Sequence, residues 1–138
     1  MAVWAGMLRL QTPGNGHVAD LTEGVARVVA AAEIDRGVVT VFAVGATVAV
    51  TTMEYEPGGI SDLQALLDRL IPAEGDYEHN RLNHDTNSHA HLRAALIGPS
   101  ETIPVIDGRP ALGTWQQIVL IDFDDRPRER TISVHVLS

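Results

Sequence analysis

Short runs of β-branched and aliphatic residues recur along this chain, with only two helical periodicities between them. The runs cover residues 3–11, 37–44, 47–53, 102–106, 112–122 and 131–137. Most are bounded by glycine, proline or aspartate turns, which is typical of strands. Because helices and strands do not alternate regularly, the pattern predicts an α+β class with mixed or antiparallel sheets and two main helices. The length of 138 residues predicts one compact domain, residues 1–138.

The two helical periodicities have different boundary signals. In residues 20–34, apolar residues recur at helical spacing from Val25 onward, and Asp20 or Thr22 is the expected N-cap. The second helix is expected to begin at the capping box of residues 61–64, after a Pro-Gly-Gly break, and to end at Pro72. Its predicted buried face consists of Leu63, Leu66, Leu67 and Leu70. The polar residues 73–91 predict a long loop.

Composition excludes several kinds of chemistry. All ten basic residues are arginine, and the chain has no cysteine. There is therefore no Schiff-base lysine, no thiolate nucleophile, no disulfide and no cysteine-based zinc or iron–sulfur site. The formal net charge of −8 argues against nucleic acid and against an anionic membrane surface as partners.

The sequence also predicts where the protein resides. The first ten residues lack the basic and apolar regions of a signal peptide. The longest apolar stretch, residues 38–50, is shorter than the roughly 20 residues that span a bilayer. We therefore expect a cytoplasmic protein.

Histidines are concentrated in one short segment. Four of the six lie within 13 positions, in a stretch that also contains Asp85 and three asparagines; they are His79, His84, His89 and His91. Imidazole is the commonest protein ligand of zinc and related ions, and a nearby carboxylate can orient it. In an extended segment the rings of His89 and His91 would lie on one side, whereas on a helix they would diverge. The segment predicts either a site for a divalent metal ion, zinc being the first choice, or a solvated loop with structural histidines.

Three further features carry candidate residues. Glu54 and Glu56 follow a predicted strand, where two carboxylates at i and i+2 can bind a cation or share a proton, or simply be solvated. Arginines at 126, 128 and 130 follow three aspartates, which predicts an exposed hairpin with cross-strand charge pairs. Trp115, between a threonine and two glutamines, is expected either in the core or at a pocket or interface.

The C-terminal half resembles a known family. Residues 100–105, Gly108 and residues 112–118 are similar to the motif of the YjbQ family, the secondary thiamine-phosphate synthase proteins. Upstream, residues 77–80 and 90–100 fit the same family in order and spacing. The resemblance covers essentially the whole chain.

The resemblance implies a compact α+β homotrimer with thiamine-phosphate synthase activity, which joins a pyrimidine pyrophosphate to a thiazole phosphate. The family's usual histidine before two threonines aligns with Gly45, and an asparagine before its acidic residue aligns with Met53. The resemblance thus implies a variant branch that lost one site histidine and gained His84 and His89. Either the site is rebuilt with different ligands, or the family activity is lost.

Three hypotheses follow. The first is a metal-assisted enzyme acting on a small phosphorylated substrate, in which the four histidines bind the metal. Glu54 or Asp85 then acts as base or orienting partner, and Arg93 stabilises the leaving pyrophosphate. The second is a non-catalytic homotrimer that binds a metal or small ligand. The third is a structural oligomer whose histidines hydrogen-bond across an interface.

Overall fold

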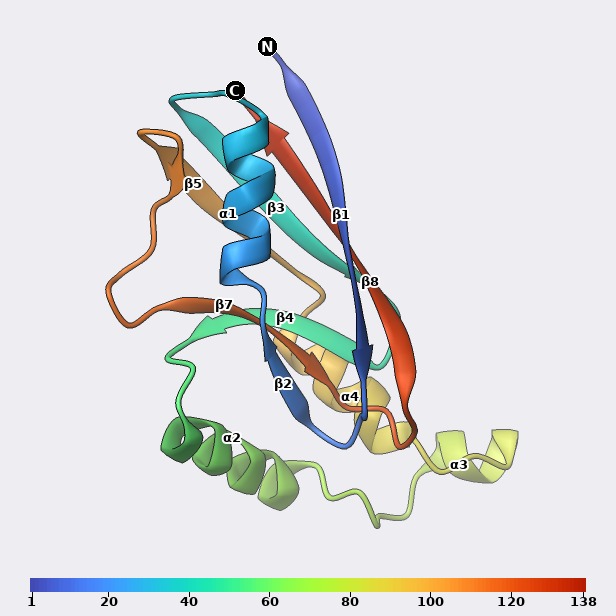
Figure 1. The fold of residues 1–138 in the computed structure, drawn as a ribbon. Helices are drawn as coiled ribbons and strands as arrows, with labels where there is room; N and C mark the ends of the chain where they lie inside the picture. The colour runs from blue at the N-terminus through green and yellow to red at the C-terminus, as the bar shows by residue number, and fades with distance from the viewer.

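The computed structural model describes residues 1–138 and contains two antiparallel sheets and four helices (Figure 1). The strands are β1 (Val3–Thr12), β2 (His17–Asp20), β3 (Gly37–Val44), β4 (Val48–Met53), β5 (Ser100–Ile106), β6 (Arg109–Pro110), β7 (Gln117–Asp122) and β8 (Arg128–Leu137). The helices are α1 (Thr22–Ala31), α2 (Pro57–Leu70), α3 (Glu78–Asn83) and α4 (Ser88–Ile97). The predicted α+β class is confirmed. None of the helices is long and apolar enough to cross a membrane.

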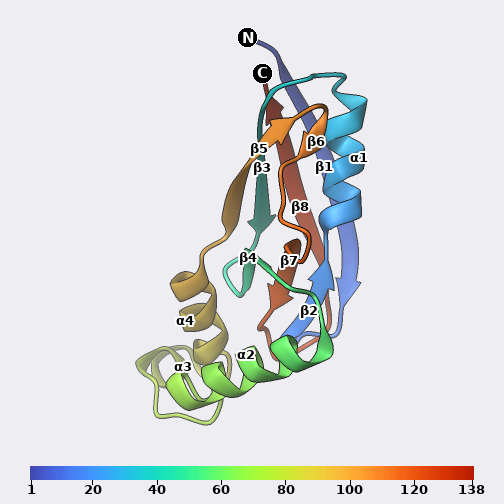
Figure 2. The ribbon, with the colours of Figure 1, turned by 90° about the vertical axis from the view of Figure 1, so that its left-hand side faces the viewer.

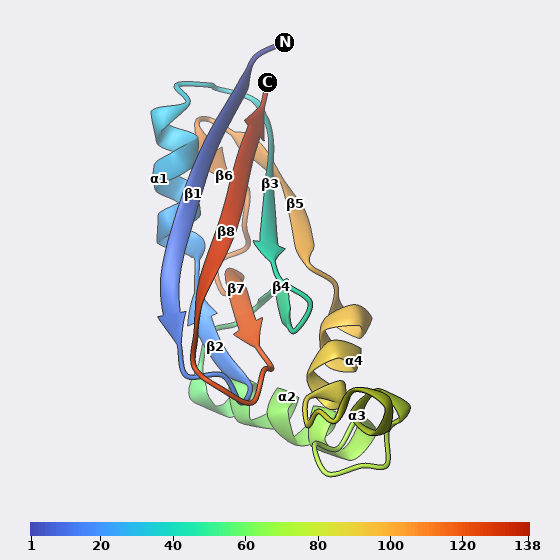
Figure 3. The same ribbon diagram turned by 90° about the vertical axis from the view of Figure 1, so that its right-hand side faces the viewer.

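The large sheet has the strand order β1-β8-β3-β5-β6. β1 and β8 pair along their whole length, from Val3 opposite Leu137 to Thr12 opposite Arg128. The N-terminal and C-terminal ends of the chain therefore lie together at one end of the molecule (Figure 3). There the N–H of Ser138 donates a hydrogen bond to the carbonyl of Ala2.

The small sheet, of order β2-β7-β4, forms a middle layer. Its central strand β7 is an unbroken apolar run because both of its faces are buried. Ile118 and Leu120 face a core shared with α1 and the large sheet. Val119 and Ile121 face a second core, which includes Leu67 of α2 and Ala90 and Ala94 of α4. Figure 2 shows α1 against the large sheet, with the other three helices at the end of the molecule away from the termini.

The face of the large sheet that points away from α1 is uncovered. The strand register places Val3, Leu137 and Val38 in one row across β1, β8 and β3. Exposed large apolar side chains on this side are Val3, Met7, Val38, Phe42, Val44, Ile106 and Leu137. We call these seven residues the outer sheet face. Exposed large apolar side chains that gather on one face in this way are typical of an interaction site.

Several predicted boundaries are wrong. The strands predicted at 37–44 and 47–53 lie in different sheets, since β3 pairs with β5 and β8 whereas β4 pairs with β7. The residues that join them, 45–47, lead the chain from one sheet to the other. The predicted loop at 73–91 contains α3 and the start of α4. The strand predicted at 112–122 begins only at Gln117.

Helix α2 begins four residues earlier than predicted. Pro57 occupies its first turn, where the missing N–H has no cost, and the carboxylate of Glu56 accepts hydrogen bonds from the N–H groups of Gly58 and Gly59. Ser61 consequently lies inside the helix. The predicted leucine face is also only partly correct, because Leu67 is buried while Leu66 and Leu70 are exposed.

Replacement of the N-cap tests this helix start. Glu56→Ala removes the acceptor for two N–H groups, and we expect the free energy of unfolding to fall by about 1 kcal/mol. Ser61→Ala is the matched control, because an exposed alanine inside a helix is at least as favourable as serine. Urea unfolding measures the free energy of unfolding of both variants. A loss of stability in Ser61→Ala alone would instead place the cap at Ser61.

Candidate functional site

An open cleft of about 220 Å³ lies between α4 and the β3–β4 connection. Its lining residues are Gly45, Ala46, Val48, His91, Ala94, Ala95 and Pro99. The end of α4 is held beside both strands, since the carbonyl of Gly98 accepts from Val50 N–H and that of Pro99 from Ala43 N–H. A larger groove of about 430 Å³ lies between β1 and α1, but it contains none of the predicted site residues. The cleft beside α4 is therefore the candidate site.

His91 and His79 form a pair beside this cleft. Their ring centroids are 4.7 Å apart and the ring planes are inclined by 46°. His91 is on α4 and His79 on α3, so the two short helices bring them together. Both side chains are half-buried. No three histidine, cysteine, aspartate or glutamate side chains of the chain converge closely enough to hold a metal ion.

The tautomer of a neutral His79 ring follows from its neighbour Asn80. The side-chain oxygen of Asn80 accepts a hydrogen bond from the N–H of Ser88 at 3.0 Å, so it is an acceptor. His79 Nδ1 lies 3.2 Å from the same oxygen and must therefore donate a proton to it. The Nε2 atom of neutral His79 is then left with a free lone pair, which is the form that binds a metal.

The other two predicted histidine ligands lie elsewhere. His84 is exposed at the left-handed C-cap of α3, with φ of 51°. His89 is buried in α4, and its Nδ1 has no hydrogen-bond partner. Because residues two apart on a helix point in nearly opposite directions, His89 does not share the cleft with His91. Burial, together with the positive charge of Arg93, lowers the pKa of His89 and keeps it neutral at neutral pH.

Arg93 is buried and holds two helices together. Its Nε and Nη2 donate to the carbonyl of Ile71, at 3.1 and 2.7 Å, just after the end of α2. Nη2 also lies 3.0 Å from Asp68, and the guanidinium lies over the ring of Phe123. Through these contacts, Arg93 holds the end of α2 against α4.

The two predicted carboxylates also lie away from the histidine pair. Glu54 is exposed beyond the far end of β4, about 20 Å along an extended strand from Val48 in the cleft. Asp85 accepts a hydrogen bond from the N–H of Thr86 and lies 3.9 Å from Arg126. Of the seven predicted site residues, the structure brings only His79 and His91 together.

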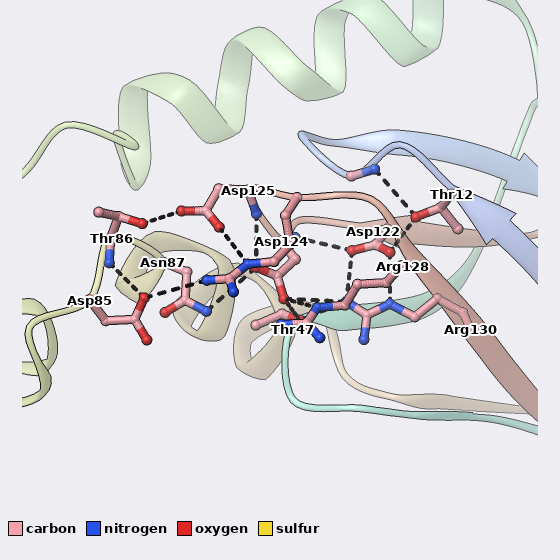
Figure 4. Close-up of polar contacts among 12 residues, drawn as sticks. Thr12, Thr47, Asp85, Thr86, Asn87, Asp122, Asp124, Asp125, Arg128 and Arg130 are labelled. Atoms are coloured by element: carbon pink, nitrogen blue, oxygen red, sulfur yellow. Dashed lines mark hydrogen bonds and ion pairs between the residues drawn. The ribbon is translucent and has the colours of Figure 1, made fainter.

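Behind the cleft lies a buried ionic cluster that joins β7, β8 and the β3–β4 connection (Figure 4). Arg130 donates from Nε and Nη2 to the two oxygens of Asp122, at 2.7 and 2.9 Å, and from Nη2 to Thr47 Oγ1 at 2.7 Å. Thr47 in turn donates to Asp124 at 3.0 Å, and Arg128 Nε lies 2.7 Å from the same carboxylate. We call Thr47, Asp122, Asp124, Arg128 and Arg130 the ionic cluster.

The sequence gives one indication of this cluster: the aspartates are followed by arginines at every second position, 126, 128 and 130. The prediction of an exposed hairpin is wrong, because Asp122 and Asp124 are at most 2% exposed and Arg130 is 7% exposed. The partners that bury them come from distant segments. Thr12 donates to Asp122, and the side-chain amide of Asn87 lies 3.5 Å from Asp124.

Trp115 is not a core residue. It is 72% exposed in the segment before β7. The adjacent glutamines hold this segment in place: Gln116 donates to Thr52 Oγ1, and Gln117 accepts from the N–H of Tyr55.

The ionic cluster predicts how stability depends on pH. Burial alone raises the pKa of Asp122, but hydrogen bonds from Arg130 and Thr12 outweigh it and the pKa is lowered. The pKa of Asp124 is likewise lowered, despite burial, by Arg128. Both carboxylates therefore bind protons more weakly in the folded chain. We expect their stabilisation to be complete above about pH 4 and to be lost as pH falls through the lowered values.

Asp122→Ala leaves Arg130 buried without its main partner, and we expect the free energy of unfolding at pH 7 to fall by about 3–5 kcal/mol. The acid-dependent loss of stability should also become shallower. Asp35→Ala removes an exposed carboxylate 3.9 Å from Arg36 and should change stability by less than about 0.5 kcal/mol. Urea unfolding between pH 3 and pH 7 measures all three proteins. Equal losses in the two variants would contradict a structural role for the cluster.

Comparison with known proteins agrees with the family resemblance. Residues 6–138 match the family "UPF0047 protein YjbQ-like". A UPF0047 protein of Methanothermobacter thermautotrophicus is 38% identical over 136 residues, which is 99% of this chain and 93% of that protein. One from Mycobacterium tuberculosis H37Rv is 41% identical over 115 residues, which is 81% of this chain and 83% of that protein.

Solved structures agree as well. The crystal structure of a hypothetical protein from Aeropyrum pernix K1 superposes with a TM-score of 0.90 at 34% identity, covering 97% of this chain and 98% of that one. The strand order and the helix positions described above are thus those of a known structural family. The chain belongs to the YjbQ-like family of UPF0047 proteins.

Proposed function

We propose that the protein is a metal-assisted enzyme whose site is the cleft between α4 and the β3–β4 connection. The observation that carries the proposal is the His79–His91 pair at 4.7 Å, with His91 in the cleft wall and His79 held by Asn80 with Nε2 free. Two imidazoles bound to one zinc ion at about 2.1 Å have ring centres about 5 Å apart, so the pair fits a shared ion. Water, substrate or a second copy of the chain supplies the remaining ligands.

The proposed reaction is the one implied by the family resemblance, the joining of a pyrimidine pyrophosphate to a thiazole phosphate. A divalent cation in the cleft supplies positive charge for a leaving pyrophosphate. His79 and His91 hold that cation, and Asn80 orients His79. The exposed positions of Glu54 and His84, the burial of His89 and the polar contacts of Asp85 and Arg93 leave these five residues outside the proposed site.

Metal content tests the histidine pair. In protein purified without a tag or chelator, we expect near-stoichiometric zinc by elemental analysis. We expect its loss in both His79→Ala and His91→Ala, because each removes half of the chain's ligand set. His84→Ala is the matched control and should retain the metal. Absence of metal from the unsubstituted protein, even after incubation with zinc, would contradict the proposal.

A second candidate function is non-catalytic binding of a metal or small ligand. It is favoured by the absence of Asp and Glu side chains from the cleft lining, which leaves no carboxylate base there. Formation of thiamine phosphate from the two substrates by metal-loaded protein distinguishes the candidates. Metal without turnover would support the binding protein.

The outer sheet face supports assembly into the proposed homotrimer. It presents seven exposed apolar side chains on strands that no helix covers on that side. Burying such a surface against a second copy is favourable by roughly 25 cal/mol per Å² of apolar area. The third hypothesis was an oligomer held together by histidines. A contact through the outer sheet face would instead be mainly apolar, since His135 is the only histidine among the strands of this sheet.

Substitution on the outer sheet face tests the assembly. Phe42→Arg places a charge in the middle of the face, and we expect it to convert a trimer into monomers, because a buried unpaired charge is costly. Leu82→Arg is the control, since Leu82 is 76% exposed on α3, away from this sheet. Size-exclusion chromatography with light scattering measures the mass. A trimer that persists in Phe42→Arg would place the interface elsewhere.

A further inference from the structure

His135 is a single imidazole in the middle of the outer sheet face. The strand register places it in one row with Ala5 of β1 and Thr40 of β3. The exposed residues on either side of this row, on the same side of the sheet, are apolar: Val3, Met7, Val38, Phe42 and Leu137. Five of the seven residues of the outer sheet face thus surround His135, which is itself exposed.

This side of the large sheet is nearly free of charge, although the chain is acidic. Alternate residues of a strand share one side, so the outward positions are the odd residues of β1 and β8 and the even residues of β3 and β5. Of the 18 carboxylate side chains, only that of Glu129 occupies such a position, and the formal charge of Arg9 offsets it. Two chains of net charge −8 can therefore meet through this side with little repulsion.

The extent of this side also suits a contact between copies. β1 and β8 have ten residues each, β3 has eight and β5 has seven. With about 3.3 Å per residue and about 4.8 Å between strands, these four strands present roughly 550 Å². Protruding side chains add to this area, which is of the order of the ~800 Å² that each partner contributes to a stable interface. The charge and the extent of this side therefore fit a second copy of the chain.

Such a contact accommodates the neutral form of His135. Its Nε2 lies 2.9 Å from Ser133 Oγ, so the ring has a polar partner on its own strand. The residues that continue its row on β3 and β5 are Thr40 and Thr102, whose hydroxyl groups are 3.0 Å apart and carry no charge. A protonated ring would find no carboxylate in this row.

The charged groups on this side are distant from His135. At about 3.3 Å per residue, Arg9 lies about 13 Å along β1 from the row and Glu129 lies about 20 Å along β8. The chain ends, the Ser138 carboxylate and the Met1 amino group, are about 10 and 13 Å along the same two strands. A positive charge on the ring would therefore be buried without a partner, which is costly.

We propose that the outer sheet face packs against a second copy of the chain only while His135 is neutral, so that acid dissociates the assembly. The inference deepens the homotrimer of the proposed function and rests on it for the contact between copies. Imidazole is the side chain that gains its charge as the pH falls from about 8 to 5. Because the charged ring is stable in the free chain and not in the contact, each proton taken up favours dissociation.

The fold itself is not the group that responds in this range. The pKa values of Asp122 and Asp124 are lowered by their hydrogen bonds, so the ionic cluster keeps its charges at pH 5.5. Acid should therefore separate folded chains, and circular dichroism at pH 5.5 checks that they are folded.

The test is the mass of the full chain at pH 7.5 and pH 5.5, measured by size-exclusion chromatography with light scattering over a range of concentrations and with a chelator in both buffers. We expect trimers at pH 7.5. At pH 5.5 the concentration at which they form should rise by about tenfold or more. His135→Gln keeps a neutral polar side chain, and its trimer should be equally stable at both pH values.

His17→Gln is the matched control, because His17 is exposed at the start of β2 in the small sheet. It should respond to acid as the unsubstituted protein does. His135→Arg introduces a permanent charge at the same position and should give folded monomers already at pH 7.5.

The outcomes separate this inference from the proposed trimer. A trimer of equal stability at both pH values overturns the inference and leaves the assembly tested by Phe42→Arg intact. An acid response that persists in His135→Gln assigns the titrating group elsewhere and also overturns it. A protein that is monomeric at pH 7.5 overturns both the trimer and the inference.

Discussion

The bidentate pair between Arg130 and Asp122 is the contact on which the arrangement of the two sheets depends. Asp122 ends β7 of the small sheet, and Arg130 lies near the start of β8 in the large sheet. Thr47 adds the β3–β4 connection to the same guanidinium. With Asp122 fully buried, its desolvation is compensated only if each oxygen has a donor, and Arg130 and Thr12 provide them. Through this pair, β7, β8 and the β3–β4 connection are joined, although they are separate segments of the sequence.

This geometry also explains the position of the cleft. The β3–β4 connection changes sheets, and its first two residues, Gly45 and Ala46, are exposed, whereas Thr47 is buried. Thr47 is tied to the ionic cluster, and the end of α4 is tied to Ala43 and Val50 through backbone hydrogen bonds. Both walls are consequently anchored to buried strands. A site built in this way is better ordered than one built on a free loop.

The fold class followed from local patterns, whereas the site depended on long-range contacts. β-Branched runs predict β1, β3, β4, β5 and β8, and the apolar stripe from Val25 predicts α1. The polar residues 73–91 obscured α3 and the start of α4, because α3 is short and buries no side chain, while α4 packs Ala90 and Ala94 against distant strands. The sequence identifies His79 and His91 as candidate metal ligands. It does not predict that they lie together, because that depends on how α3 and α4 are placed. The role of Arg130 could not be foreseen, since Thr47 reaches it from 83 positions away, and Thr12 reaches its partner Asp122 from 110 positions away.

Gly45 connects the family resemblance to this chain's own chemistry. The resemblance places a histidine where this chain has glycine, and a Cβ at that position conflicts with Arg130 Nη1 as it is held here. The conformation of Arg130 and the absence of a side chain at residue 45 are therefore coupled. A guanidinium cannot replace a neutral imidazole as a metal ligand, because it has donors and no lone pair.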